Sequence, residues 1–424
     1  MQAKTYLTLF AVLALAGFSL VASFNYLVDP YRFFDTTDRP GLNEYRQRFF
    51  YGQYVSKPYA LREQAPEAVI LGVSRAGSSL ATDHPGWGET RVYNYAMAGS
   101  TAYLIWRNYQ HAKAGGNIKK VVLMLDFYMF NVYQDERHKA SQIREYEERL
   151  AVTPDNKRNT GYPVRLFKDT LTSLISLEML YESWNTVLAQ SKIANQQLYK
   201  ANLTRSGFWI NDPDPVKTQR WVFGYIENQY MTSTWFPQPG RQFNLRREDG
   251  STNLVYLQNI VADAHRENIE LTLAFMPFHA RLAESMQAVG IWDEFEQWKK
   301  DVILLVEGEA AATKSTPFPI WDFTGYNSIT TESVPLQSDK KTRMLWHLDP
   351  SHVSRAAGDL MQNRILDTNG ERREDFGQLV NSDNINSYLQ RSRKARKRYA
   401  KMFPEDVKEV KRKAAKTASW RENN

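Results

Sequence analysis

The pattern of apolar and polar residues first predicts a membrane-spanning helix near the amino terminus. Residues 5–28 are 24 residues without a charged side chain, mostly leucine, alanine, valine and phenylalanine. About 20 apolar residues in a helix cross the hydrocarbon core of a bilayer. Lys4 precedes this segment and both acidic and basic residues follow it. This arrangement favours a single-pass protein of the cell (inner) membrane, with a cytoplasmic amino terminus and an extracytoplasmic, periplasmic body.

A cleaved signal peptide is the alternative for the same segment. Residues 21–23 are Val-Ala-Ser, and small residues of this kind are accepted by signal peptidases. The apolar run is long for the hydrophobic region of a signal peptide, so we prefer an uncleaved anchor. A buried core helix fits less well, because a polar segment with Pro30 and Pro40 follows at once.

Beyond the anchor, short apolar runs that end at glycine alternate with helical patterns. Residues 66–75 and 91–98 predict two strands, the second ending at Gly99, residues 101–114 a helix, and residues 120–128 a third strand. Strand, helix and strand at this spacing are typical of a βαβ unit. The expected fold class is therefore α/β, with a flavodoxin-like, doubly wound parallel sheet.

The same alternation resumes late in the chain. Helices are expected at 254–267, 292–307 and 352–366, and strands at 270–276 and 319–323. Between the two parts the periodicity becomes helical and polar over a length too great for a loop, which predicts an inserted subdomain. The predicted divisions are an anchor (1–28), an α/β domain (29–131 and 250–370), a largely helical insertion (132–249) and a basic tail (371–424).

The basic charge of the chain is concentrated in this tail. The formal net charge is +7, but residues 391–424 hold 13 Lys and Arg against four Asp and Glu, leaving 41 basic and 43 acidic residues elsewhere. In a cytosolic protein such a tail would indicate nucleic-acid binding. Outside the membrane it favours anionic lipid headgroups or an acidic polysaccharide, with a solvated tail without a partner as the alternative. No nucleic acid is expected as a partner.

Residues with catalytic chemistry follow the first and last predicted strands. Ser74 comes at the carboxyl end of the first strand, just after Gly72, where an α/β enzyme presents a nucleophile. A serine hydroxyl needs a base, and the base needs an acid that fixes its tautomer. Asp349 and His352 offer both within four residues. The alternative for Ser74 is that it merely caps the helix after it. Asp349 could likewise cap the final helix, and for Asp349 the two roles can coexist.

A second Asp-x-x-His occurs at Asp135 and His138, so the spacing alone does not identify the base. The earlier pair lies in a charged run that predicts a solvated surface. Asp349 and His352 lie instead between a strand and an amphipathic helix, on the sheet edge expected for Ser74. Cysteine is absent from the chain, which excludes disulfides, thiolate zinc sites and cysteine nucleophiles.

Other polar and aromatic residues are expected to be structural. Asn94 lies within the second strand and predicts a buried hydrogen-bonding residue, and His279 predicts a core or surface histidine. Core packing is also the main expectation for the aromatic residues of the insertion, with stacking on sugar rings as the alternative. These are Trp184, Trp209, Trp221, Tyr225, Tyr230, Trp235 and Phe236.

The order of these motifs resembles the SGNH (GDSL-like) hydrolase superfamily. Gly-x-Ser at 72–74, the glycine-ended block at 94–100 and Asp-x-x-His at 349–352 carry the resemblance, which covers residues 25–135 and 250–370. More closely, the chain is similar to the membrane-anchored envelope branch that includes the teichoic-acid D-alanyl transfer protein and the alginate O-acetylation proteins. Asp29-Pro30-Tyr31, directly after the anchor, also resembles that branch.

The resemblance implies a role for each matching residue. Ser74 is the expected nucleophile, Gly99 an oxyanion donor, His352 the base and Asp349 its orienting acid. It further implies a serine O-acyltransferase, of the O-acetyl kind, that modifies an envelope or exported polysaccharide through an acyl-serine intermediate. No cofactor or metal is expected, and a membrane-bound O-acyltransferase is the implied partner. An esterase with the same triad and a non-catalytic polysaccharide-binding or assembly factor are the alternatives.

Two departures from the family pattern concern the signature and the oxyanion hole. Val73 replaces the acidic residue of the Gly-Asp-Ser signature, and the anchored branch often lacks this acidic residue too. The third block, normally Gly-x-Asn-Asp, reads Leu-Asp-Phe-Tyr-Met-Phe-Asn at 125–131. One oxyanion donor can contribute ~3 kcal/mol to transition-state stabilisation. Asn131 or Arg75 is expected to join the backbone donors, although Arg75 could equally form an ion pair with Asp126.

Overall fold

The computed structural model describes residues 2–133, 140–236 and 242–422. Asp135 and His138, the second Asp-x-x-His pair, lie outside these residues. The chain divides into two compact units. The amino-terminal unit contains Met1–Glu63, Arg144–Arg205 and Trp209–Val216, and the sheet unit contains Gln64–Ile143, Ser206–Phe208 and Lys217–Asn424.

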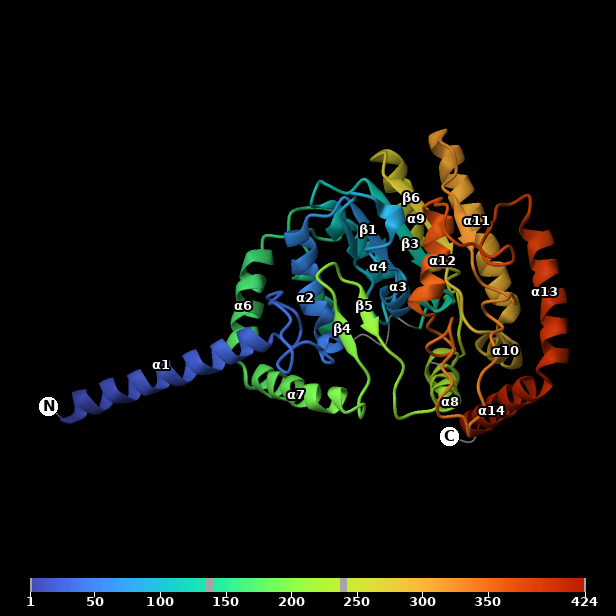
Figure 1. Cartoon of the computed structure of the whole chain (residues 1–424). Coiled ribbons are helices and arrows are strands. Elements are labelled where there is room, and N and C mark those ends of the chain that lie inside the picture. The colour runs from blue at the N-terminus through green and yellow to red at the C-terminus, as the bar shows by residue number, and fades with distance from the viewer. Residues whose placement is uncertain (1, 134–139, 237–241, 423–424) are drawn as a thin grey trace. The chain divides into compact units, whose positions relative to one another are not determined.

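The sheet unit is built on a six-stranded, mostly parallel sheet (Figure 1). Its strands are β1 (Ala68–Leu71), β2 (Val92–Asn94), β3 (Lys120–Leu125), β6 (Glu270–Phe275), β7 (Ile320–Asp322) and β8 (Gln378–Leu379). They lie in the order β2-β1-β3-β6-β7-β8, and only β8 runs antiparallel to its neighbour. The expected α/β class and parallel sheet are confirmed. The five parallel strands have the order 2-1-3-4-5, which is one of the two common doubly wound orders.

Helices cover both faces of this sheet. They are α3 (Ser74–Ser79), α4 (Ala102–Lys113), α9 (Leu254–Arg266), α10 (Ala280–Ala288), α11 (Trp292–Thr313) and α12 (Arg355–Ile365). On one face, residues of α3 and α12 pack in a common core with Ile70 and Val122. On the other face, side chains of α4 and α9 lie against Leu123 and Leu125. Because successive strand residues point to opposite faces, the continuous apolar strands predicted from the sequence are buried on both sides.

The last sheet helix begins later than expected. Residues 352–366 were the predicted span, but α12 begins at Arg355. Ser354 is its N-cap, and the Ser354 side chain accepts a hydrogen bond from the backbone N–H of Ala357. This cap leaves His352 outside the helix, in the preceding turn.

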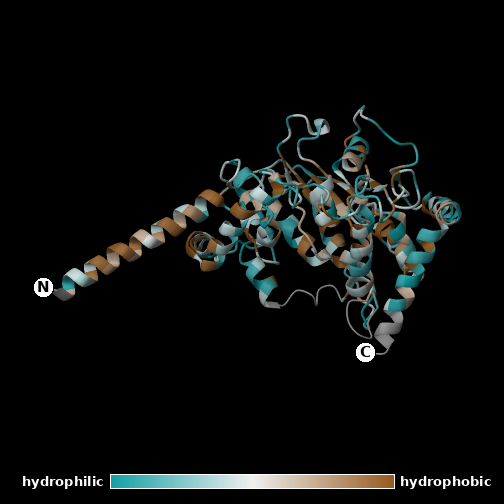
Figure 2. Cartoon of the chain, turned by 60° about the horizontal axis from the view of Figure 1, so that its bottom comes forward, coloured by the Kyte–Doolittle hydropathy of each residue, from teal (hydrophilic) through white to brown (hydrophobic). Residues whose placement is uncertain are grey.

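The amino-terminal unit contains the long apolar helix and two further helices packed at its end. Its helices include α1 (Gln2–Val28), α2 (Phe49–Gln64), α6 (Tyr162–Ile175) and α7 (Leu177–Ala194), and its hairpin consists of β4 (Ala201–Leu203) and β5 (Trp209–Asn211). α1 is long and apolar enough to cross a membrane over Ala3–Val28. Figure 2 shows α1 as a largely apolar helix from its amino terminus to the folded part.

The two compact units divide the chain differently from the predicted insertion. Residues 144–205 and 209–216 belong with residues 1–63, whereas residues 217–249 belong to the sheet unit. Long-range polar contacts explain the first association, because the Tyr59 hydroxyl donates to Asp169 at 2.7 Å. In the sheet unit, residues 217–249 include α8 (Gln219–Gln229) and the π-helical turn η4 (Tyr230–Thr234).

The basic tail forms two helices that pack on the sheet unit, α13 (Ile385–Met402) and α14 (Pro404–Glu422). Part of their basic charge points inward: Arg393 pairs with Glu296, Arg396 with Glu284, and Lys413 with Glu227. All three glutamates are almost fully buried. Ion pairs with buried carboxylates therefore hold the tail on the body of the protein.

Glu409 on α14 predicts an acid-sensitive part of this contact. Its carboxylate meets Arg220 at 2.8 Å, Lys413 at 3.0 Å and Arg281 at 3.3 Å. Burial raises the pKa of Glu409, but Arg281 and its other basic neighbours outweigh burial and lower the pKa to about 2. A carboxylate with a depressed pKa stabilises the fold above its ordinary pKa of 4.5, and this stabilisation is lost as the pH falls towards 2.

We expect Glu409→Gln to lower the free energy of unfolding by about 1 kcal/mol at neutral pH, since the carboxylate is partly exposed. Urea titrations at neutral pH and near pH 2 measure this difference. The two proteins should converge in acid, and an equal difference at both pH values would contradict the prediction.

Gly358 marks a close approach between α12 and α3. A Cβ atom at Gly358 would lie 1.8 Å from the backbone oxygen of Ser79. We expect Gly358→Ala to lower the free energy of unfolding by about 3 kcal/mol, because backbone has to move to relieve the clash. Gly308 on α11 is the matched control, since its Cβ would meet nothing within 4 Å. Gly308→Ala should stabilise the protein by up to about 1 kcal/mol in the same urea titrations.

Candidate active site

Ser74 lies at the carboxyl edge of the sheet, where β1 passes into α3. β1 ends at Leu71, and Ser74 is the first residue of α3. Gly72 allows this sharp passage, because a Cβ there would lie 2.8 Å from the Ala76 Cβ and 3.1 Å from the Met124 Cβ. As the first helical residue, Ser74 has no intrahelical acceptor for its backbone N–H. The turn therefore presents both the hydroxyl and a backbone donor of Ser74.

Asp349 and His352 belong to a tight turn that precedes α12. The turn is closed by the backbone N–H of Leu348, which donates to the His352 carbonyl at 2.9 Å. Asp349 Oδ1 accepts from the backbone N–H groups of Ser351 at 2.7 Å and His352 at 2.8 Å. The alternative that Asp349 caps the final helix is wrong, because Ser354 is the N-cap of α12. Asp349 instead organises the turn that carries His352.

The structure brings Ser74, His352 and Asp349 into one hydrogen-bonded row. His352 Nε2 lies 2.9 Å from Ser74 Oγ, and His352 Nδ1 lies 2.7 Å from Asp349 Oδ2. An ionised carboxylate only accepts, so Nδ1 carries the proton and Nε2 is free to accept from the serine hydroxyl. All three residues are half-buried, so the row reaches solvent. This is the geometry of a general base poised on a nucleophile.

Asp349 is held in its ionised form by this arrangement. Burial would raise the pKa of its carboxyl group, but His352 and the backbone N–H groups of the turn outweigh burial and lower the pKa below its ordinary value. An ionised carboxylate at this position stabilises an imidazolium ring as it forms. Asp349 can therefore orient His352 and support its protonation.

Gly99 lies in the loop after β2 and has a backbone angle that favours glycine, with φ of +69°. The loop is tied to the serine turn, because the backbone N–H of Met97 donates to the Gly72 carbonyl at 3.1 Å. Asn94 adds two bonds from Nδ2, to the carbonyl oxygens of Ala76 at 3.0 Å and Leu80 at 2.9 Å. The prediction that Asn94 is a buried hydrogen-bonding residue is confirmed.

Arg75 forms an ion pair with Asp126 next to Ser74. Its guanidinium contacts the Asp126 carboxylate, and both side chains are almost fully buried. The rings of Tyr128 and Phe278 also lie within 6 Å of the guanidinium carbon, at 5.6 and 5.7 Å. Burial raises the pKa of Asp126 to about 6, although Arg75 opposes this shift. Of the two interpretations of Arg75, the ion pair is confirmed, and its role as an oxyanion donor stays a prediction.

Asn131 retains an unused donor. Its Oδ1 accepts from the backbone N–H groups of Tyr133 at 3.2 Å and Asn244 at 3.3 Å. Its Nδ2 is buried and has no hydrogen-bond partner among the described residues. Asn131 Nδ2 is therefore a buried donor without a partner among the described residues, and its role in an oxyanion hole stays a prediction.

Hydrogen bonds of His279 and Glu332 hold the turn of residues 348–352, which we call the triad turn, and the residues just before it. The backbone N–H of His279 donates to the Pro350 carbonyl at 2.9 Å, and His279 Nε2 lies 2.7 Å from the Glu332 carbonyl. The Glu332 carboxylate accepts from the backbone N–H groups of Leu345 at 2.6 Å and Trp346 at 3.0 Å. Burial, reinforced by His347, lowers the pKa of His279 well below its ordinary value. His279 is thus a neutral core histidine, as predicted.

Tyr230 is a site residue that sequence reasoning placed only among the core aromatics. Its hydroxyl lies 2.6 Å from the Ser351 Oγ, inside the triad turn, and its ring meets Tyr128 at a centroid distance of 6.2 Å. Tyr230 begins the π-helical turn η4. Such turns are frequent at functional sites. The sequence carried no signal for this contact, because 121 positions separate its two partners.

We expect Tyr230→Phe to slow reaction at Ser74 about fivefold, because the loss of one neutral hydrogen bond weakens the turn that carries His352 by about 1 kcal/mol. Tyr225→Phe is the matched control, since Tyr225 lies exposed on α8. Rates of active-site acylation measure both changes. Equal rates for the two variants would show that the Tyr230 hydroxyl does not position the turn.

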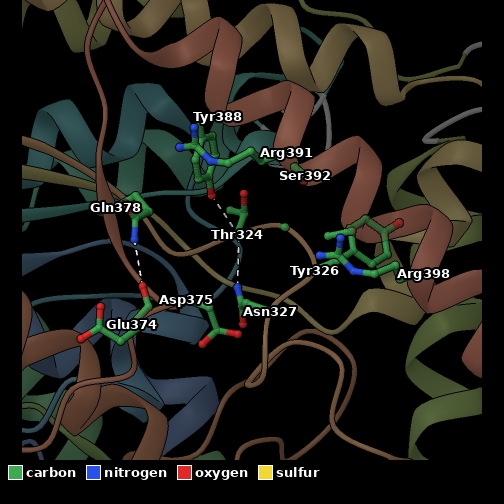
Figure 3. Close-up of a pocket in the computed structure, with 12 residues that line it drawn as sticks. Thr324, Tyr326, Asn327, Glu374, Asp375, Gln378, Tyr388, Arg391, Ser392 and Arg398 are labelled. Carbon is green, nitrogen blue, oxygen red and sulfur yellow. Dashed lines mark hydrogen bonds between the residues drawn. The ribbon is translucent and has the colours of Figure 1, made fainter.

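A cavity of about 280 Å³ lies elsewhere in the sheet unit, between the loop after β7 and α13 (Figure 3). The Tyr388 hydroxyl donates to the Thr324 carbonyl at 3.1 Å, and the Asp375 carboxylate accepts from Ser328. None of the three triad residues lines this cavity. Among the described residues, no group of three or more histidine and acidic side chains is arranged to hold a metal ion.

Comparisons with protein families and curated proteins found no match to this chain: no family model matches the sequence, and no curated protein is significantly similar to it. The fold and the site therefore define the class by themselves: an α/β protein with a mostly parallel sheet, an apolar amino-terminal helix and a Ser-His-Asp row at the carboxyl edge of the sheet.

Proposed function

We propose that the protein is a membrane-anchored, extracytoplasmic serine O-acyltransferase of the SGNH type, which transfers an acetyl group to an envelope or exported polysaccharide. The single observation that carries the proposal is the hydrogen-bonded row from Ser74 through His352 to Asp349. This row is the arrangement that activates a serine hydroxyl for attack on an acyl carbon. The acyl group and the polysaccharide acceptor rest on the resemblance of the motifs to the anchored envelope branch.

The first half-reaction forms an acyl-serine. Ser74 Oγ attacks the carbonyl carbon of an acyl ester, and its proton passes to His352 Nε2. The tetrahedral oxyanion is stabilised by the backbone N–H groups of Ser74 and Gly99, with Asn131 Nδ2 as third donor. When the ester bond breaks, the imidazolium returns its proton to the leaving oxygen. Asp349 stabilises the imidazolium throughout.

The second half-reaction transfers the acyl group to the acceptor. A sugar hydroxyl attacks the acyl-serine, its proton passes to His352 Nε2, and the proton is then returned to Ser74 Oγ as that bond breaks. Water in place of the sugar hydroxyl would give hydrolysis by the same steps. The identity of the second nucleophile therefore separates a transferase from an esterase.

The anchor supports a membrane-tethered location for this chemistry, and the extracytoplasmic side rests on the lysine before the apolar segment. α1 is long and apolar enough to cross the membrane. An acceptor polysaccharide assembled or exported outside the membrane would then be within reach of the tethered site. A membrane-bound O-acyltransferase is the partner proposed to deliver the acyl group across the membrane, and polysaccharide is the proposed acceptor.

The test uses the purified full-length protein in lipid nanodiscs. A fluorophosphonate should label Ser74, as located by peptide mass spectrometry. With p-nitrophenyl acetate as donor and an envelope glycan as acceptor, acetylated glycan should appear in proportion to the p-nitrophenol released. Exclusive release of free acetate would identify an esterase. An absence of label on Ser74, with glycan binding retained, would favour the non-catalytic binding factor.

A further inference from the structure

The helices α6 and α7 of the amino-terminal unit bury mainly polar residues and expose eight large apolar ones. Met179, Ala189 and Ile193 are the buried apolar residues of α7. On α6 the buried residues are Arg165, Asp169 and Ser173. On α7 the buried set includes Glu182, Ser183, Thr186 and Gln190. A surface helix of a water-soluble domain shows the opposite pattern, with an apolar stripe facing the core. The outer face of this helix pair is therefore suited to an apolar medium rather than to water.

The exposed apolar residues form one stripe on each helix. They follow the spacing of a single helical face, with steps of three or four residues. On α6 they are Val164, Phe167, Leu171 and Ile175, and on α7 they are Leu177, Tyr181, Trp184 and Leu188. Their exposed fractions run from 40% for Leu171 to 81% for Leu177. We call these eight residues the apolar stripe.

The inward-facing polar residues are satisfied, so the reversed pattern is a stable packing arrangement. The Asp169 carboxylate accepts from Arg149 at 2.7 and 3.1 Å, from Arg165 at 3.0 Å and from the Tyr59 hydroxyl at 2.7 Å. Burial opposes ionisation of Asp169, but Arg149 and the other donors outweigh burial and lower its pKa. Buried charges require partners of this kind. The polar core thus fixes the orientation that leaves the apolar stripe outside.

The helix pair packs against the carboxyl end of α1. Asn25 of α1 is fully buried there: its Nδ2 donates to the Leu174 carbonyl at 2.9 Å, and its Oδ1 accepts from the Ser183 hydroxyl at 2.9 Å. In Figure 1, α6 and α7 lie beside this end of α1. The amino-terminal part of α1, by contrast, is exposed along its length. The helix pair therefore lies beside the end of the anchor that joins the folded unit.

The length of α1 sets the level of this contact relative to a bilayer. About 20 helical residues cross the ~30 Å hydrocarbon core. Counted from Thr5, the first residue after Lys4, the core ends at about residue 24, just before Asn25. The helix pair therefore lies where acyl chains meet headgroups. Tyr181 and Trp184, the aromatic members of the stripe, are residue types enriched at this level.

We propose that α6 and α7 form a membrane-surface platform, with the apolar stripe inserted among the phospholipids of the leaflet where α1 leaves the bilayer. The proposal rests on the membrane-spanning role of α1. A helix with one strongly apolar face binds a bilayer in this way, parallel to its plane. The platform would fix the amino-terminal unit to the membrane surface at two places, through α1 and through the stripe.

The absence of cysteine allows a test in the full-length chain. Single cysteines replace Phe167, Leu177 or Leu188 and carry a nitrobenzoxadiazole label, after reconstitution into phosphatidylethanolamine and phosphatidylglycerol vesicles. Leu304→Cys is the matched water control, because Leu304 is an exposed leucine on α11 of the sheet unit. Leu13→Cys, within α1, reports insertion of the anchor.

We expect the emission of the three stripe labels to shift to shorter wavelength and to be quenched most by lipids with a nitroxide near the headgroup. The Leu13 label should be quenched most by a nitroxide deep in the acyl chain, and the Leu304 label by neither. If the stripe labels emit at the wavelength of a label in water while the Leu13 label is quenched, the platform is overturned and the anchor is retained.

Two other results would also overturn the proposal. Stripe labels that are shifted but not quenched would show that protein, such as a second copy, covers the apolar stripe. A Leu13 label that no lipid quenches would show that α1 does not insert, which removes the basis of the platform. Fluorophosphonate labelling of Ser74 is measured in the same samples, so failure of the catalytic proposal is distinguished from failure of the platform.

Discussion

Replacing Ser74 by alanine is expected to lower the rate of acyl transfer by about 10⁴-fold to 10⁶-fold. The substitution removes the atom proposed to form the acyl bond, and His352 then has no hydroxyl proton to accept from residue 74. A small residual rate is expected, because the protein would still bind the ester and its oxyanion donors could still stabilise attack by water. Stopped-flow measurement of p-nitrophenol release, with mass spectrometry of the acyl-protein, checks both the rate and the loss of the intermediate.

Ser78→Ala is the matched control for this experiment. Ser78 lies one turn further along α3, where its hydroxyl donates to the Ser74 carbonyl at 3.1 Å. Its removal leaves the Ser74 hydroxyl and the His352 contact unchanged, so the rate should stay within about threefold of the natural protein. An acyl-protein that still forms in the Ser74→Ala variant would refute Ser74 as the nucleophile.

Replacing Asp349 by asparagine is expected to lower the same rate by about 10⁴-fold while the fold is retained. The amide oxygen can keep the backbone bonds to Ser351 and His352 that Oδ1 makes now. The amide nitrogen would then face His352 Nδ1, which must become the acceptor. The imidazole proton moves to Nε2, and the ring can no longer take the proton of Ser74.

Nitrogen-15 NMR of the His352 ring tests this explanation directly, because it reports which ring nitrogen carries the proton. Asp83→Asn is the control carboxylate, since Asp83 is exposed and pairs with Arg355. It should leave the rate unchanged. If the Asp349→Asn variant is slow but His352 Nδ1 remains protonated, the aspartate does not act by selecting the tautomer of His352.

Local sequence signals determined the class of the fold and the strand that precedes Ser74. The strands at 66–75 and 120–128 were predictable because parallel strands covered on both faces read as continuous apolar runs. The apolar helix α1 was predictable because its length and composition match a bilayer without reference to any other residue. The two-residue strand β8 was not predicted, because its two residues carry no pattern of their own.

The candidate site was predictable in part. Ser74, Asp349 and His352 were found from motif order and from the resemblance. Only the fold shows that Ser74 Oγ and His352 Nε2 lie 2.9 Å apart, although 278 positions separate the two residues in the chain. The choice for Arg75 between an ion pair and an oxyanion donor was even from sequence. The structure confirms the ion pair with the buried Asp126 carboxylate at the neighbouring strand end, which is a tertiary contact. Tyr230 lay beyond prediction for the same reason.

By itself, therefore, the sequence determined what depends on neighbouring residues: the anchor, the βαβ alternation, and the glycine and serine at the first strand end. The tertiary structure decided what depends on contacts between distant segments. It paired the inward basic residues of α13 and α14 with buried glutamates, and it turned the polar residues of α6 and α7 inward. A helical pattern shows which residues share a face, but only packing decides which face meets protein and which meets another medium.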